Sequence, residues 1–533
     1  MLRALAVLVA VLVAVLLVAL PSSAQARQRS PFDSPVLPAR SAAHARQALP
    51  LGAPSLLETR TKERLARGVT YTKIVRGRPA KKDGWTVDVA VVSDRPAARD
   101  QARRLRVAGF DADVERLGRP PDGPGRGPLG YRVHSGLFTA KDQSDRRATA
   151  IAASGIPVRG SVFTAEDGER TSGPWVVHVL TIDPAAYPGR VAPVLSNDVV
   201  ADRETLSSLS ARKRALAGVN GGYFVIGAGD GTPGDPAGTS ILDGQVVSEA
   251  VDGRTDLLLG GPFPSIAALS DVQSVSASDG ATRALDGDNR KPGLIRACGG
   301  TGGDSPTELP QHDVTCTDPS ELIRSTAISG ARTDAGDGAE ALLDAGGVVT
   351  TLREPRGGPI PAQGSVLSGT GDAADWLRAH AQPSSQMTLR TVVNRERGPL
   401  ALTPSLGVVN GGPRLLRHGR PDITAEAEGF DHPGDPSFYY AFGLRRNPRT
   451  LAGVTAHGRL LLVAVDGRAP GYSAGLNFAE EAAVMRALGA RDAVNLDGGG
   501  STAMTINGTV VTRPSDTTGE RPIGDAILLL PGS

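Results

Sequence analysis

The stretch VNLDGGGSTAM, Val494–Met504, places a carboxylate, three glycines and two hydroxyls directly after an apolar run. The backbone of Gly498, Gly499 and Gly500 can approach a ligand closely and can present N–H groups to an anion. A second carboxylate, Asp466, follows the apolar run RLLLVAV, and Arg468 comes two residues later. Together with Asp497, these residues suit a substrate that carries a phosphate and a bond broken by acid–base chemistry.

The elements around these residues form a predicted β-α-β unit. RLLLVAV and AVNL are buried strands, and a helix begins after Asn477, where Glu480 completes a capping box, and ends at Gly489. Two strands joined in this way should be parallel with a right-handed crossover, so Asp466 and Asp497 should leave the sheet at the same edge.

Similar residue types recur at other predicted strand ends. NGGYF begins at Asn220 and continues with Gly221 and Gly222, LGVV runs into Asn410-Gly411-Gly412, and DGDNR ends at Arg290. Each stretch pairs an amide or guanidinium donor with glycine. Ser501 could also be read as a nucleophile, but its surroundings do not match G-x-S-x-G, and a hydrogen bond to a sugar or to the turn is the favoured interpretation.

Composition and targeting signals limit the class of protein. The chain has 533 residues, 66 glycines, 40 prolines and a net charge of +2, which gives no general argument for nucleic acid as a partner. Residues 1–26 read as a secretory signal peptide, the alternative being an uncleaved anchor, and no later segment is apolar enough to span a membrane. We therefore expect a secreted protein, extracellular or associated with the cell wall, in which Cys298 and Cys316 form a disulfide.

Residues 27–55 read as a disordered linker, and 56–82 contain a short strand, VTYTKIV, that could belong to the main domain. Residues 83–170 then predict the order β-α-β-β-α-β, with helices over 95–107 and 141–153. GWTVDVAVVSDRPAARDQARRLRVAGFDADVE and YRVHSGLFTAKDQSDR resemble the SPOR family, which implies a ferredoxin-like domain that binds peptidoglycan. A spacer that binds nothing is the alternative.

Residues 173–533 predict many strands and few helices, and hence an α+β domain with large mixed sheets. VNGGYF, DGDNRKPGLIRACGG, NPRTLAG, VAVDGR and VNLDGGGSTAM stand in the order seen in phosphodiester glycosidases, and this region resembles that family. The resemblance implies removal of N-acetylglucosamine from a sugar-1-phosphodiester. The resemblance implies substrate-binding roles for Asn220, Gly221, Gly222, Arg290, Arg449, Thr450, Arg468, Asn495, Gly498, Gly499, Gly500 and Ser501.

The resulting hypothesis is a secreted hydrolase of sugar-1-phosphodiesters. One of Asp466 and Asp497 would act as general acid and the other as base or nucleophile, while Arg290, Arg468 and the glycine amides would hold the phosphate. A non-catalytic wall-binding protein and an esterase or amidase using Ser501 are the alternatives. No cofactor is required by this chemistry. The oxygen-rich loops leave room for a structural divalent cation, but they do not fit the EF-hand pattern.

Overall fold

The computed structural model describes residues 48–532 apart from 124–125, 169, 262, 299–313 and 433. The predicted signal peptide, residues 1–26, and most of the predicted linker lie outside the described residues. Residues 48–532 form one compact unit that is rich in sheet. The α+β class is therefore as predicted.

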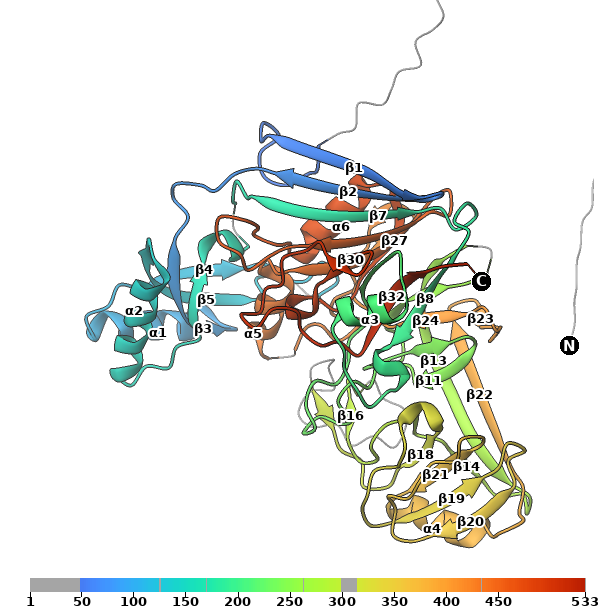
Figure 1. Cartoon of the computed structure of the whole chain (residues 1–533). Coiled ribbons are helices and arrows are strands. Elements are labelled where there is room, and N and C mark those ends of the chain that lie inside the picture. Colours follow the sequence, from blue (N-terminus) through green and yellow to red (C-terminus); the bar gives the residue numbers. More distant parts are fainter. Residues whose placement is uncertain are drawn as a thin grey trace, which may run out of the picture. The chain divides into compact units, whose positions relative to one another are not determined.

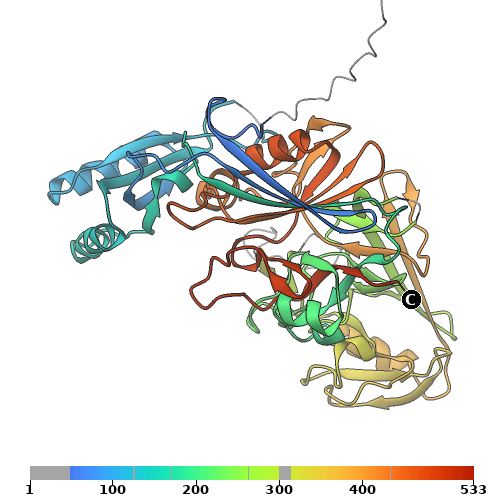
Figure 2. The same cartoon turned by 45° about the horizontal axis from the view of Figure 1, so that its top comes forward.

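The largest sheet runs through the main domain and carries both predicted aspartates. Its strands, in spatial order, are β1 (Glu58–Ala66), β2 (Val69–Arg76), β7 (Trp175–Ile182), β28 (Leu460–Val465), β27 (Arg449–Thr455), β29 (Ala490–Asn495), β25 (Arg414–Arg417) and β26 (Arg420–Pro421). The hairpin β1–β2 lies along β7 (Figure 1, Figure 2), so the short strand predicted within 56–82 joins the main sheet.

Three further sheets complete the main domain, together with the short pair β16 (Ile295–Arg296) and β17 (Thr315–Cys316). The second sheet contains β11 (Gln245–Ser248), β10 (Ser240–Leu242), β24 (Gly407–Val409), β12 (Thr255–Leu259), β13 (Ser265–Ala277), β22 (Met387–Arg395), β23 (Gly398–Pro399) and β14 (Thr282–Ala284). The third contains β31 (Thr509–Val510), β30 (Met504–Ile506), β9 (Ala217–Asn220), β32 (Asp525–Leu530) and β8 (Arg190–Leu195). The fourth contains β15 (Gly287–Asp288), β18 (Leu322–Ser325), β21 (Ser365–Gly369), β19 (Ala339–Leu343) and β20 (Val349–Arg353).

Helices are few and short. The α-helices are α1 (Arg95–Val107), α2 (Lys141–Ala153), α3 (Leu206–Arg212), α4 (Gly371–His380), α5 (Pro436–Tyr439) and α6 (Phe478–Ala487). Single tighter or wider turns are η1 (Thr164–Glu166), η2 (Ser196–Asp198), η3 (Ala327–Ser329), η4 (Tyr440–Leu444) and η5 (Gly499–Ser501). The capping box predicted for α6 is present, because Asn477 and Glu480 exchange side-chain to backbone hydrogen bonds.

The prediction of mixed sheets is wrong for the large sheets. β28 and β29 do run in the same direction and end at the same edge, as predicted, but β27 lies between them and is antiparallel to both. Every pairing in the largest sheet is antiparallel, and within the described residues the parallel pairing is the short one between β15 and β18. The α6 connection steps over a strand, which local periodicity does not reveal.

Strand β28 shows how the largest sheet is buried on both faces. Alternate residues along a strand point to opposite faces. Leu461, Val463 and Val465 pack in the core beneath α6. Leu460 and Leu462 pack on the other face, in a core shared with strands of the second and third sheets. The main domain is therefore layered, with α6 on one side of the largest sheet and further sheets on the other.

Residues 83–170 form a four-stranded sheet with two helices, in the predicted β-α-β-β-α-β order. The strands, in spatial order, are β4 (Asp113–Leu117), β5 (Gly130–Phe138), β3 (Trp85–Val92) and β6 (Gly160–Phe163). Val87, Val89 and Val133 pack on one face of this sheet against residues of α1 and α2. Figure 1 shows these elements in blue and teal. We call this segment the small unit.

The opposite face of the small sheet is attached to the main domain through Tyr440. The Tyr440 hydroxyl donates a hydrogen bond to Asp88 Oδ2 at 3.3 Å, and the Arg132 guanidinium lies 5.6 Å from the centre of the Tyr440 ring. Asp88 and Arg132 form a buried ion pair at 2.5 Å. The small unit is thus joined to the main domain by a buried polar contact.

The predicted linker, 27–55, extends too far, because residues 48–55 contribute to the core. Leu49 and Leu51 are both fully buried in the core that contains Trp175. The buried Arg76 guanidinium donates to the backbone oxygens of Leu51 and Ala53 and so holds this segment in place. Composition alone indicated disorder, and two isolated leucines gave no periodicity to oppose that interpretation.

We predict that Leu51→Ala lowers the free energy of unfolding by about 2–5 kcal/mol, because it leaves a cavity in a packed core. Leu57→Ala is the matched control, since Leu57 is 85% exposed and its loss should change stability by less than about 0.5 kcal/mol. Denaturant unfolding of both variants measures the difference. Equal effects would contradict the placement of 48–55 in the core.

Candidate functional site

Asp497 follows β29 and leads into the glycine turn η5. The residue as a whole is half-buried. Burial raises the pKa of Asp497 to about 6, and the nearby Ser501 hydroxyl, the Arg521 guanidinium, the Gly498 N–H and Arg468 oppose that rise. This carboxyl can therefore change protonation state near neutral pH, as acid–base chemistry requires.

The three glycines allow two arginines to flank the turn. Gly499 has φ +59°, and a β-carbon there would lie 3.3 Å from Arg468 Nη2. A β-carbon on Gly500 would collide with the guanidinium of Arg521. Asp516 holds Arg521 through an ion pair at 2.8 Å. Because Gly499 and Gly500 have no side chains, the guanidinium groups of Arg468 and Arg521 can approach the backbone beside Asp497.

Arg468 is not neutralised by an acidic partner at ion-pair distance among the described residues. Its guanidinium donates to the neutral amide oxygen of Asn447 at 2.9 and 3.3 Å, and its side chain is exposed. Desolvation and the positive charges of Arg445 and Arg449 lower the pKa of Arg468. The charge of Glu166 opposes this shift only in part, so an anionic ligand beside Arg468 would be stabilised.

Asn220 fixes the turn from the neighbouring sheet. Its Nδ2 donates to the Asp497 backbone oxygen at 2.7 Å, and its Oδ1 accepts from the Thr450 hydroxyl at 2.6 Å and from Ala503 N at 3.1 Å. Asp497 N also donates to Gly221 O at 3.2 Å. Asn220 and Thr450 are fully buried. They therefore position Asp497 rather than present groups to a ligand.

Asp525, at the start of β32, is a carboxylate near Asp497 that the sequence analysis missed. Its Oδ1 accepts from Gly222 N at 2.9 Å, and a β-carbon on Gly221 would collide with its carboxylate. Burial, with the negative charge of Asp497, raises the pKa of Asp525 to about 7. Only 3% of Asp525 is exposed, so it supports the Asn220–Gly222 loop from behind.

Asp466 occupies a separate, closed environment. Its Oδ2 lies 3.2 Å from His178 Nε2 and accepts from the Tyr472 hydroxyl at 3.1 Å, while Oδ1 accepts from Arg513 N at 2.9 Å. Asp466 is 1% exposed. The two predicted catalytic aspartates leave the same sheet edge, yet the contacts of Asp466 join it to β7 and to the loop after β31. This arrangement fits a positioning role.

Two of the predicted phosphate or substrate ligands are neutralised inside the protein. Arg290 is buried, with ion pairs to Glu249 and Glu321, both at 2.5 Å. Arg449 is buried against the Phe478 ring, and its guanidinium forms an ion pair with Glu481 at 2.8 Å. Both guanidinium groups therefore have acidic partners at ion-pair distance, unlike that of Arg468.

Asn495 and Glu166 complete the surroundings. Asn495 Nδ2 donates to the Tyr223 hydroxyl at 2.7 Å and to Gly412 O at 2.9 Å, so it ties β29 to the loop after β24. Glu166, at the end of η1, lies 3.7 Å from Arg445 and also interacts with Arg468. Burial raises the pKa of Glu166 to about 7. Nothing in its sequence context marked Glu166 as part of a site.

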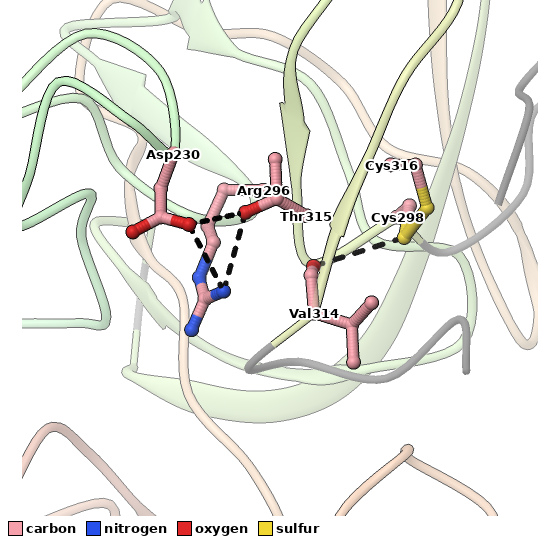
Figure 3. Close-up of a disulfide and its surroundings, with 6 residues drawn as sticks. All are labelled: Asp230, Arg296, Cys298, Val314, Thr315 and Cys316. Carbon is pink, nitrogen blue, oxygen red and sulfur yellow. Dashed lines mark hydrogen bonds and ion pairs between the residues drawn. A yellow bond between two sulfur atoms is a disulfide. The ribbon is translucent and has the colours of Figure 1, made fainter. Parts of the chain in front are cut away.

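The predicted disulfide is present. Cys298 and Cys316 are bonded, with their Cα atoms 5.8 Å apart, and Arg296 and Thr315 beside them contact Asp230 (Figure 3). The described residues contain no group of three or more His, Cys, Asp or Glu side chains that could hold a metal ion. No helix in the described ranges is long and apolar enough to cross a membrane.

Comparison with known proteins identifies the domain that holds this site. Residues 337–530, which include Arg468, Asp497, Arg521 and Asp525, match the family described as phosphodiester glycosidase. This segment is therefore similar to phosphodiester glycosidases. The curated relatives include the N-acetylglucosamine-1-phosphodiester alpha-N-acetylglucosaminidases of Mus musculus, 32% identical over 116 residues, and of Bos taurus, 31% identical over 114 residues. The matches cover 22% and 21% of this chain, and the same shares of the two relatives.

Solved structures extend the similarity beyond the phosphodiester glycosidase match. A putative exported protein from Burkholderia pseudomallei is 34% identical with a TM-score of 0.82, and the match covers 91% of this chain and 98% of that one. A hypothetical protein from Synechocystis shares the fold, with 17% identity, a TM-score of 0.52 and coverage of 89% and 81%. The architecture around residues 337–530 therefore recurs in the Burkholderia pseudomallei protein, at 34% identity.

We predict that Gly500→Ala disrupts the site without unfolding the protein. The added methyl group must displace Arg521, which removes one of the two cations beside Asp497, and an affinity loss of about tenfold or more for a phosphate-bearing ligand follows. Gly229→Ala is the control, since a β-carbon there meets only open space. Calorimetric titration with UDP-N-acetylglucosamine compares the two. An unchanged affinity in Gly500→Ala would remove Arg521 from the site.

Proposed function

We propose that this protein hydrolyses sugar-1-phosphodiesters of the N-acetylglucosamine type, with Asp497 at the anomeric carbon. The observation that carries the proposal is the half-buried Asp497, with its raised pKa, next to a glycine turn flanked by Arg468 and Arg521. The phosphodiester glycosidase match and the names of the curated relatives support the substrate class. Because the matches cover about a fifth of those relatives, the activity of the whole chain is part of the proposal.

In this proposal Arg468, Arg521 and the N–H groups of the turn hold the phosphate, and the bond between the anomeric carbon and the phosphate oxygen breaks. The electron pair leaves with the phosphate, which departs as a stable anion and needs little protonation. Water supplies the hydroxyl at the anomeric carbon, and its proton is released. Asp497 acts either as the nucleophile or as the base for that water, while Asp466 positions neighbouring segments from its closed environment.

We also propose that the protein acts outside the cytoplasm and that the small unit holds it near peptidoglycan. The Cys298–Cys316 disulfide fits an oxidising compartment, and the similar Burkholderia pseudomallei protein is described as exported. The resemblance of the small unit to SPOR domains supports the peptidoglycan partner. Cosedimentation of the protein with isolated cell walls tests it, and absence from the wall pellet would contradict it.

We predict that Asp497→Asn abolishes hydrolysis of UDP-N-acetylglucosamine, with a loss of at least about 10³-fold in kcat. The protein lacking residues 1–26 is assayed for free sugar beside the variant and beside Asp492→Asn, a control on the same strand. Proton NMR of the first sugar released separates the two roles, because a nucleophile gives retention and a base gives inversion. Turnover by Asp497→Asn at the wild-type rate would overturn the assignment.

We predict that kcat/KM rises with pH through an apparent pKa near 6, since either role needs ionised Asp497. Arg521→Gln removes a cation that favours the ionised form, so the midpoint should move to higher pH by about one unit. Arg491→Gln, at an exposed position of β29, should leave the midpoint in place. A rate that falls through pH 6 would instead make Asp497 a general acid.

A further inference from the structure

The small unit has an arginine-lined groove between α1 and β4, which the proposed active site does not use. The groove has a volume of about 560 Å³. Its charged lining residues are Arg95, Arg99, Arg106, Arg116 and Asp113. We call it the arginine groove. Four guanidinium groups against one carboxylate make it strongly positive.

The arginines of the groove are poorly neutralised within the protein. Arg95, Arg99 and Arg116 are exposed, and none of them forms an ion pair with a carboxylate among the described residues. Arg106 donates to the backbone oxygen of Ala112 rather than to an acid. By contrast, Arg103 on the same helix but outside the groove is paired with Asp100. The groove therefore has positive charge available for an external anion.

The spacing of the arginines favours a polymer over a single anion. Arg95, Arg99 and Arg106 follow one another along one side of α1, which rises about 1.5 Å per residue, so the row is roughly 16 Å long. Arg116 lies across from them on β4, an edge strand that pairs only with β5 in the described sheet. Anionic groups repeated along a chain would meet several guanidinium groups at once.

Both faces of the small sheet are covered near its centre, whereas the arginine groove is open. The helices pack over one face, and Tyr440 of the main domain contacts Asp88 and Arg132 on the other. An extended polymer cannot lie across either face at those positions. The arginine groove, which opens at the sheet edge, is accessible instead.

We propose that the arginine groove binds a polymer with repeated phosphodiester groups, the same polymer class whose sugar-1-phosphodiesters the glycosidase domain would cleave. Guanidinium forks match phosphate oxygens in a bidentate manner, and several contacts of this kind give strong, salt-dependent binding. The choice of polymer rests on the proposed function, while the positive charge of the groove does not. The groove would keep the enzyme on a chain that presents many cleavable bonds.

The test measures binding of an end-labelled poly(glycerol phosphate) chain by fluorescence anisotropy, in the full protein. This probe has repeated phosphodiester groups but no anomeric carbon, so the proposed reaction cannot consume it. The triple variant Arg95→Gln/Arg99→Gln/Arg116→Gln should lose at least about tenfold in affinity at low salt. Its slope of log affinity against log salt should fall by about 2–3. The matched control Arg103→Gln/Arg104→Gln/Arg146→Gln makes the same charge change outside the groove and should bind like its parent. Thermal unfolding of both variants checks that they are folded.

Three outcomes would overturn the proposal: equal binding by the triple variant and the control, equal affinity for a neutral chitooligosaccharide, or tighter binding of single-stranded DNA with the same number of phosphates. Hydrolysis of UDP-N-acetylglucosamine by the full protein is measured separately. Binding through the groove without any hydrolysis would reject the proposed function alone. Hydrolysis without binding through the groove would reject this inference alone.

Discussion

The side-chain amide of Asn220 is the contact on which the proposed active site depends. One oxygen accepts hydrogen bonds from Thr450 on β27 and from Ala503 before β30, and the nitrogen donates to the Asp497 backbone after β29. One buried residue therefore joins the third sheet to the largest sheet at the point where the reactive carboxyl leaves it. Loss of one partner would leave a buried polar group unsatisfied, at a cost of about 1–3 kcal/mol.

Local signals explain why much of the fold could be predicted from the sequence. The cap of α6 by Asn477 and Glu480 and the bounds of α1 and α2 each depend on residues a few positions apart. The insertion of β27 between β28 and β29 could not be found in this way. The position of β27 depends on which strands, distant in the sequence, bury the most apolar surface against one another. Strands buried on both faces look alike in sequence, so the pattern does not show which of them are neighbours.

The two aspartates show the same limit at the site. Asp466 and Asp497 both follow an apolar strand and precede glycine, so the sequence treats them as equivalent. The structure separates them, because His178 and Arg513 reach Asp466 from distant segments while Asp497 stays partly exposed. The sequence analysis missed Arg521, Asp525 and Glu166 because their roles also depend on distant contacts. Each contributes through a contact with a residue far along the chain, and no local motif marks it.

The partner of each arginine decides which of them can bind an anion. Arg290, Arg449 and Arg132 are buried, and each forms an ion pair with at least one buried carboxylate. Their positive charge is therefore neutralised within the protein. Arg468 instead donates to the neutral amide of Asn447 at an exposed position. The arginines of the groove likewise lack acidic partners among the described residues. A motif can supply an arginine at either kind of position, but an arginine without an acidic partner at ion-pair distance gains most from a phosphate. Arg468 and the arginine groove meet that condition, whereas Arg521 shares its charge with Asp516.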